Sequence, residues 1–118
     1  MSWTKVATLD ELEVGKPHRV ELNEPLCVVR TDDDTVHAVH DICSHQEWSL
    51  AEGYLETVND RPHIECGLHG SSFDLASGKP DILPAVKPIP VYAAKIEDGA
   101  VWVDMDAQTN DATVPRHY

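Results

Sequence analysis

Basic residues are scarce in this sequence: nine Lys and Arg stand against 21 Asp and Glu, which gives a net charge of −12. Nucleic-acid-binding proteins normally carry a basic surface, and anionic membranes attract basic segments. The composition therefore argues against nucleic acid and against a membrane surface as partners. An acidic protein is steered toward basic surfaces, and we expect its partner proteins to present them.

Long apolar runs are missing as well. No stretch approaches the roughly 20 apolar residues that span a bilayer. The first residues lack the basic region and apolar core of a secretory signal. Only three cysteines occur, which cannot all pair and which suit a reducing compartment. These features predict a cytoplasmic protein.

The length limits the architecture. A chain of 118 residues suits one domain, which can bury a core without disulfides, and it leaves no room for a large catalytic domain. Hydrophobic residues make up 42% of the chain and charged residues 25%, as in folded globular proteins. Any complex chemistry therefore needs a cofactor or a partner.

Short apolar stretches separated by Gly, Pro, Asn and Asp predict an all-β fold. Asp32–Asp34 and Asp98–Gly99 are typical of hairpin turns. Thr8, followed by Glu11, predicts a capping box on a single helical turn. The expected strands are Thr4–Ala7, His18–Leu22, Pro25–Arg30, Val36–Val39, His63–Cys66, Ser72–Asp74, Val91–Glu97 and Ala100–Asp104.

The expected strands fall into two groups. Residues 1–40 and 86–107 have the pattern of one β-domain, whereas residues 41–85 are rich in loops and hold the unusual residues. We therefore predict a single domain over residues 1–107, in which residues 41–85 form an inserted subdomain that carries a site. Residues 108–118 lack periodicity and are expected to form a flexible tail.

Two loops in the inserted segment each contain one cysteine and one histidine. Cys43 and His45 lie in the first loop, and Cys66 and His69 lie in the second, with the spacing C-x-H-x20-C-x-x-H. A thiolate and an imidazole from each of two short loops indicate a metal site. We therefore predict these four residues as metal ligands.

Three interpretations of this pattern compete. Zinc sites usually take two Cys from one loop and two His together, whereas here each loop is mixed. Mixed loops suit a [2Fe–2S] cluster in which two Cys bind one iron and two His bind the other. Nucleophilic catalysis would use one Cys–His pair and leave the second pair unexplained. The mixed loops favour the cluster, and zinc stays as the first alternative.

The segment around these residues resembles the Rieske iron–sulfur proteins. Leu68–Asp74 is similar to the second cluster loop of that family, Ser77–Pro80 to the turn that follows it, and Leu83–Ala85 to the proline loop that covers the cluster. The resemblance implies the Rieske fold, an antiparallel β-sandwich base with an inserted cluster-binding subdomain. It also implies one Rieske-type [2Fe–2S] cluster as the cofactor.

The resemblance further implies which residues surround the cluster: Trp48, Leu68, Gly70, Ser71, Phe73 and Pro84. High-potential members of the family carry a disulfide at the positions of Trp48 and Leu68 and a tyrosine at the position of Phe73. Ser71 remains as a donor to a bridging sulfur. Because the other two features are missing, we expect a potential toward the lower end of the Rieske range of roughly −150 to +300 mV.

The whole chain looks most like the small, free-standing Rieske ferredoxins. That likeness implies a non-catalytic carrier of single electrons, with a flavin-dependent reductase and a terminal non-heme iron oxygenase as partners. Two alternatives stay open: a protein linked to iron–sulfur cluster assembly or redox sensing, and the small subunit of a nitrite reductase. The length excludes a self-contained oxygenase, which needs a mononuclear iron site on an additional domain.

The remaining Cys and His residues near the motif are interpreted without a metal. Cys27 lies in an expected strand and is predicted to be a buried core thiol. His37, His40 and His63 are predicted to lie on strand surfaces.

Overall fold

The structure is a computed structural model that describes residues 3–22, 24–42, 49–58, 61–66, 72–82, 88–110 and 112. Within these ranges the chain forms ten strands and two short 3₁₀ turns, η1 and η2. The elements are β1 (Trp3–Thr8), η1 (Leu9–Glu11), β2 (Pro17–Glu21), β3 (Pro25–Asp32), β4 (Thr35–His40), η2 (Leu50–Glu52), β5 (Tyr54–Val58), β6 (Arg61–Glu65), β7 (Ser72–Asp74), β8 (Pro80–Ile82), β9 (Val91–Glu97) and β10 (Ala100–Gln108).

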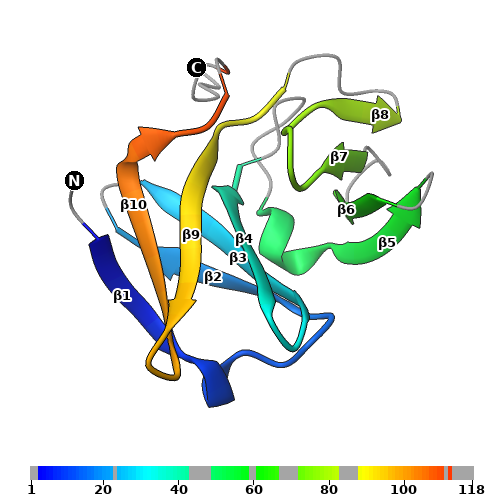
Figure 1. Cartoon of the computed structure of the whole chain (residues 1–118). Coiled ribbons are helices and arrows are strands. Elements are labelled where there is room, and N and C mark those ends of the chain that lie inside the picture. The colour runs from blue at the N-terminus through cyan, green and yellow to red at the C-terminus, as the bar shows by residue number, and fades with distance from the viewer. Residues whose placement is uncertain are drawn as a thin grey trace.

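The strands form two antiparallel sheets (Figure 1). The larger sheet is curled and has the order β1-β10-β9-β4-β3-β2, and the smaller has the order β5-β6-β7-β8. The smaller sheet is formed by the chain between β4 and β9, two strands that pair with each other through Ala38↔Tyr92 and Val39↔Val91. It is therefore an insertion into the larger sheet, and the predicted all-β fold with an inserted subdomain is confirmed.

Local signals in the sequence explain how the base sheet turns. Asp98 and Gly99 have φ of 53° and 71° and join β9 to β10, as a two-residue turn with left-handed backbone requires. Asp33–Asp34 separate β3 from β4 and are exposed. The capping box is present: the Thr8 N–H and hydroxyl donate to Glu11 Oε1 at 2.8 and 2.9 Å. These bonds lower the pKa of Glu11. All three predictions are confirmed.

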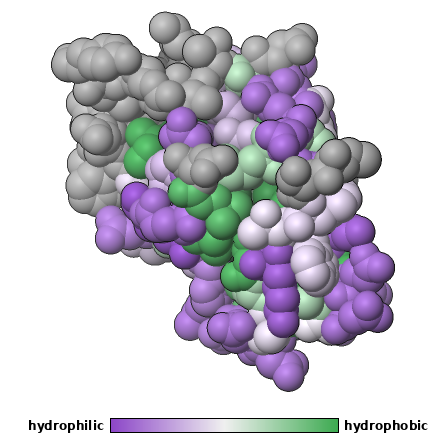
Figure 2. All heavy atoms as spheres, turned by 90° about the vertical axis from the view of Figure 1, so that its left-hand side faces the viewer, coloured by the Kyte–Doolittle hydropathy of each residue, from purple (hydrophilic) through white to green (hydrophobic). Residues whose placement is uncertain are grey.

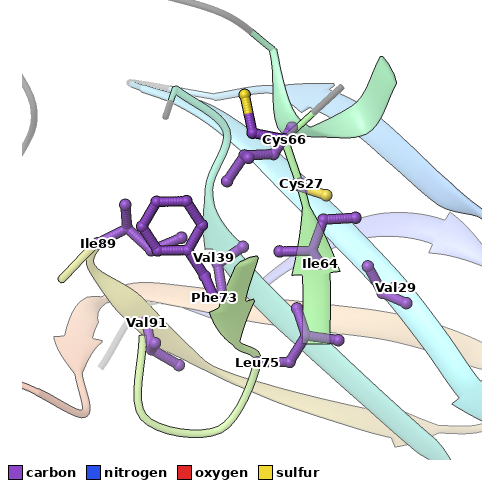
Figure 3. Close-up of a cluster of buried hydrophobic side chains, with 10 residues drawn as sticks. Cys27, Val29, Val39, Ile64, Cys66, Phe73, Leu75, Ile89 and Val91 are labelled. Atoms are coloured by element: carbon purple, nitrogen blue, oxygen red, sulfur yellow. The ribbon is translucent and has the colours of Figure 1, made fainter. Parts of the chain in front are cut away.

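The core has two parts because both faces of β3 are buried. Successive side chains on a strand point to opposite faces. Leu26 and Val28 accordingly pack inside the curled base sheet, whereas Cys27 and Val29 pack between the two sheets. The second group meets the apolar side chains of the small sheet (Figure 3). This inter-sheet cluster consists of Cys27, Val29, Val39, Leu50, Ile64, Cys66, Phe73, Leu75, Ile89 and Val91.

The surface on the side of β1 and β10 is mostly hydrophilic, with some apolar atoms in the middle of that face (Figure 2). Among the described residues, no helix is long and apolar enough to cross a membrane.

The start of the expected tail is fixed to the fold. The Thr109 N–H donates to the Val91 carbonyl at 2.8 Å, and Asn110 Nδ2 donates to the Ser77 and Ile89 carbonyls at 2.9 and 2.8 Å. The prediction of a flexible tail from residue 108 is therefore wrong for residues 108–110, because their hydrogen bonds reach distant segments that no local pattern reveals. Residue 111 and residues 113–118 lie outside the described residues.

Candidate metal centre

The first predicted cluster loop has a closed base. Ile42 and Ser49 form an isolated antiparallel bridge, and the Leu50 N–H donates to the Asp41 carbonyl at 2.6 Å. Residues 43–48, which contain Cys43, His45 and Trp48, lie between these two ends and outside the described residues. The chain thus leaves β4 and returns to η2 through hydrogen-bonded neighbours.

The second predicted loop has the same construction. β6 and β7 are antiparallel, and their last pair is Glu65↔Ser72. Cys66 follows Glu65 in the chain, and the next residue that the structure describes is Ser72. Leu68, His69, Gly70 and Ser71 lie outside the described residues, as does Pro84.

The bases of the two loops are packed against each other. Leu50, which begins η2 after the first loop, belongs to the same buried cluster as Cys66 and Ile64. Gly53 follows η2 and lies close to the backbone of Glu65. A Cβ at residue 53 would lie 1.8 Å from the Glu65 carbonyl oxygen. Because Glu65 precedes Cys66, the end of the first loop lies beside the start of the second.

Cys66 is the one predicted ligand among the described residues. Its side chain is buried, with 2% exposed, and it is a free thiol. Figure 3 shows its Sγ directed away from Phe73, Ile64 and Val39. Soft thiolates suit iron–sulfur clusters. A free, buried cysteine at the mouth of this loop fits that ligand role.

Phe73 is the other predicted site residue that the structure describes. Its ring is fully buried in the inter-sheet cluster, next to Ile89 and Val39 (Figure 3). It shares that cluster with Cys66, so the two residues lie on one side of the small sheet. The next residue toward the loop, Ser72, is also buried, and its hydroxyl has no hydrogen-bond partner in the described part of the chain.

Cys27 has the surroundings of a core thiol, as predicted. It is fully buried in β3, and burial strongly raises the pKa of its thiol, with a smaller contribution from the charge of Asp41. A thiol with a raised pKa supplies little of the thiolate that binds metals. Cys27 therefore serves as a small apolar residue.

The prediction for the nearby histidines is wrong for two of the three. His40 and His63 are each 1% exposed. His40 Nδ1 accepts the Ile42 N–H at 3.3 Å, and His63 Nδ1 lies 2.9 Å from the Arg61 carbonyl. His37 is partly buried, which lowers its pKa, although the charges of Asp74 and Asp32 oppose this effect. Local hydrogen bonds, which strand periodicity does not reveal, allow the imidazoles to be buried.

The described residues contain no group of three or more His, Cys, Asp or Glu side chains arranged to hold a metal. Three of the four predicted ligands, Cys43, His45 and His69, fall outside those residues, so the ligand set stays a prediction. The structure brings together the bases of the two loops, and Cys66 and Phe73 share the buried cluster that contains Leu50.

Comparison with known proteins identifies the family. The Rieske [2Fe-2S] domain matches residues 2–93, and the chain belongs to this family. The 3-phenylpropionate/cinnamic acid dioxygenase ferredoxin subunit of Photorhabdus laumondii is 36% identical over 92% of this chain and 99% of its own length.

Solved structures agree with this assignment. The ferredoxin of carbazole 1,9a-dioxygenase from Nocardioides aromaticivorans has a TM-score of 0.79 and 34% identity over 87% of this chain and 97% of its own. A chain in a complex of reduced oxygenase and oxidized ferredoxin of carbazole 1,9a-dioxygenase has a TM-score of 0.75 and 29% identity over 98% of this chain and 97% of its own.

The protein is therefore an electron-transfer protein of the Rieske ferredoxin type and not a catalytic subunit. Its cofactor is a Rieske-type [2Fe–2S] cluster. The predictions of family, function and cofactor are confirmed, and zinc is not the metal that the family implies.

Proposed function

We propose that this protein carries single electrons from a flavin-dependent reductase to a terminal non-heme iron oxygenase in the cytoplasm. The observation that carries the proposal is the identity to a dioxygenase ferredoxin subunit over 92% of this chain and 99% of that one. This identity favours the carrier over the assembly-linked protein and the nitrite reductase subunit that the sequence left open.

In this proposal Cys43 and Cys66 bind one iron, and His45 and His69 bind the other. Held by these residues, the cluster would supply one-electron redox chemistry. Support comes from the free, buried thiol of Cys66 and from the packing of Gly53 against the base of the second loop.

The other predicted residues would surround the cluster from the same two loops and from the proline loop. Trp48, Leu68 and Pro84 would shield it from water, Gly70 would let the second loop turn, and the Ser71 hydroxyl would donate to a bridging sulfur. We also propose that residues 41–85 act as the cluster-binding subdomain and that the remaining strands act as its base.

The electron-transfer proposal is tested with oxygenases of known relatives. The reduced protein is mixed anaerobically with the oxygenases of the Photorhabdus 3-phenylpropionate/cinnamic acid and Nocardioides carbazole systems. We expect it to reduce at least one of them. Failure with both, while their own ferredoxins succeed, would contradict the proposal.

The acidic composition predicts how transfer depends on salt. The net charge of −12 favours basic partner surfaces, and screening shortens the reach of charges from about 10 Å at 0.1 M to about 3 Å at 1 M salt. The second-order rate of oxygenase reduction should therefore fall as ionic strength rises. A rate that is independent of salt would count against a basic partner surface.

Phe73→Tyr should raise the midpoint potential. Donors aimed at the cluster sulfurs or their ligands stabilise the reduced form, and Phe73 has no hydroxyl to donate. Phe73 is buried in the same group of side chains as Cys66, so we expect an added hydroxyl to lie near the metal cluster. A redox titration of the two proteins measures the effect, and an unchanged potential would show that no donor reaches the cluster from residue 73.

A further inference from the structure

Asp41 is a buried carboxylate at the base of the first cluster loop. It follows β4, precedes the Ile42↔Ser49 bridge and lies two residues before Cys43. Its side chain is fully buried. Burying a charge is costly unless the group is paired and hydrogen-bonded, so the contacts of the Asp41 carboxylate must offset that cost.

These contacts join the two ends of the loop. Oδ2 accepts the Ser49 hydroxyl at 2.5 Å and Arg19 Nη1 at 3.0 Å, and Oδ1 accepts the Ala51 N–H at 2.9 Å. The backbone carbonyl of Asp41 accepts the Leu50 N–H. Ser49, Leu50 and Ala51 are the residues with which the chain returns from the loop, so Asp41 holds both ends together.

The charge of Asp41 is only partly compensated. Arg19 comes from β2, its side chain is 42% exposed, and its Nε also bonds Glu21 Oε1 at 2.8 Å. Water and Glu21 thus weaken the positive charge, whereas the carboxylate has no exposed surface. The carboxylate belongs to the residue two positions before Cys43, at the base of the first loop. A negative field at the loop opposes the addition of an electron to the cluster.

We propose that Asp41 is a positioning residue that anchors the first cluster loop and, through its charge, holds the potential of the cluster low, with Arg19 limiting that effect. The inference rests on the proposed function, because it requires Cys43 and His45 to bind the cluster. It goes further by assigning opposite electrostatic roles to two residues that are not ligands.

The test compares midpoint potentials of cluster-loaded variants by spectroelectrochemical titration. Asp41→Asn keeps an oxygen acceptor and removes the charge, so the ratio of reduced to oxidised cluster at a fixed potential should rise by about tenfold, or about 59 mV. Arg19→Gln removes the positive charge that pairs with the Asp41 carboxylate, so it should lower the ratio of reduced to oxidised cluster. Asp34→Asn removes an exposed charge at the opposite end of β4 and should change it little.

Opposite shifts for Asp41→Asn and Arg19→Gln support the proposal, because a purely structural clamp would move both potentials in one direction or neither. Shifts of the same sign, or no shift, overturn it. Ser49→Ala separates anchoring from charge: it should speed cluster loss, measured as bleaching at constant temperature, and leave the potential near that of the wild type. Cluster loss as slow as in the wild type would overturn the anchoring role.

If Asp41→Asn does not fold, Arg19→Gln decides alone, and an unchanged or higher potential in that variant overturns the charge role. The wild-type protein is measured first by EPR. If the wild-type protein lacks the signal of a His-ligated [2Fe–2S] cluster, the proposed ligand set is wrong. If it shows the signal, the variants test the inference about Asp41 alone.

Discussion

Cys66→Ser should abolish the [2Fe–2S] cluster, whereas Cys27→Ala should leave it in place. The two cysteines form a matched pair, because both are free and almost completely buried in the same inter-sheet cluster. Only Cys66 lies at the base of a predicted cluster loop, with its sulfur directed away from the apolar side chains (Figure 3). A serine hydroxyl does not replace the thiolate that the cluster requires.

The readouts are iron and sulfide per chain and the visible spectrum. Cys66→Ser should be colourless with iron near zero. Cys27→Ala should keep both iron atoms and lose about 1–2 kcal/mol of stability through the shortened core side chain. A coloured Cys66→Ser protein with full iron, or a colourless Cys27→Ala protein that remains folded, would contradict the assignment of Cys66 as a ligand.

Gly53→Ala should have the second-largest effect of the predicted substitutions: it should lower the stability of the protein and speed the loss of the cluster. A Cβ at residue 53 would lie 1.8 Å from the carbonyl oxygen of Glu65 and 3.2 Å from that of Leu50. Backbone atoms cannot rotate away as a side chain can, so the bases of the two loops must separate. Such overpacking costs about 1–3 kcal/mol or more, and the displaced residue directly precedes Cys66.

Gly15→Ala is the control for Gly53→Ala. Gly15 has φ of +86°, but a Cβ there would meet nothing within 4 Å. Its substitution should cost about 1–2 kcal/mol from backbone strain alone and leave the rate of cluster loss unchanged. Denaturant unfolding followed by circular dichroism, together with the rate of bleaching, compares the variants. The close packing of the two loop bases would be contradicted if Gly53→Ala kept its cluster as long as Gly15→Ala.

Much of the base sheet could be predicted because its signals are local. The Asp98–Gly99 turn needs two residues that accept positive φ, and both are found there. The β9 strand has the predicted bounds, Val91–Glu97, and ends at this turn. β5 was not predicted as a strand, because Tyr54 is 66% exposed and the strand depends on its pairing with β6 rather than on an apolar face.

The sequence predicts which residues are the ligands, but it does not reveal the contacts that support the two loops. The spacing of Cys43, His45, Cys66 and His69 predicts a [2Fe–2S] site, since thiolates and imidazoles in two mixed loops suit few other roles. The contact between Arg19 and Asp41 joins residues 22 positions apart, and no periodicity marks it. Both residues lie beside β3: Arg19 pairs with Cys27, and the Asp41 N–H donates to the Pro25 carbonyl.

The most direct test of the central claim is the EPR spectrum of the purified protein after reduction with dithionite. We predict an axial or rhombic signal with a low average g value, as expected for a [2Fe–2S] cluster with two histidine ligands on one iron. The oxidised protein should be brown. A colourless protein that contains stoichiometric zinc and gives no such signal, even after reconstitution with iron and sulfide, would contradict the account.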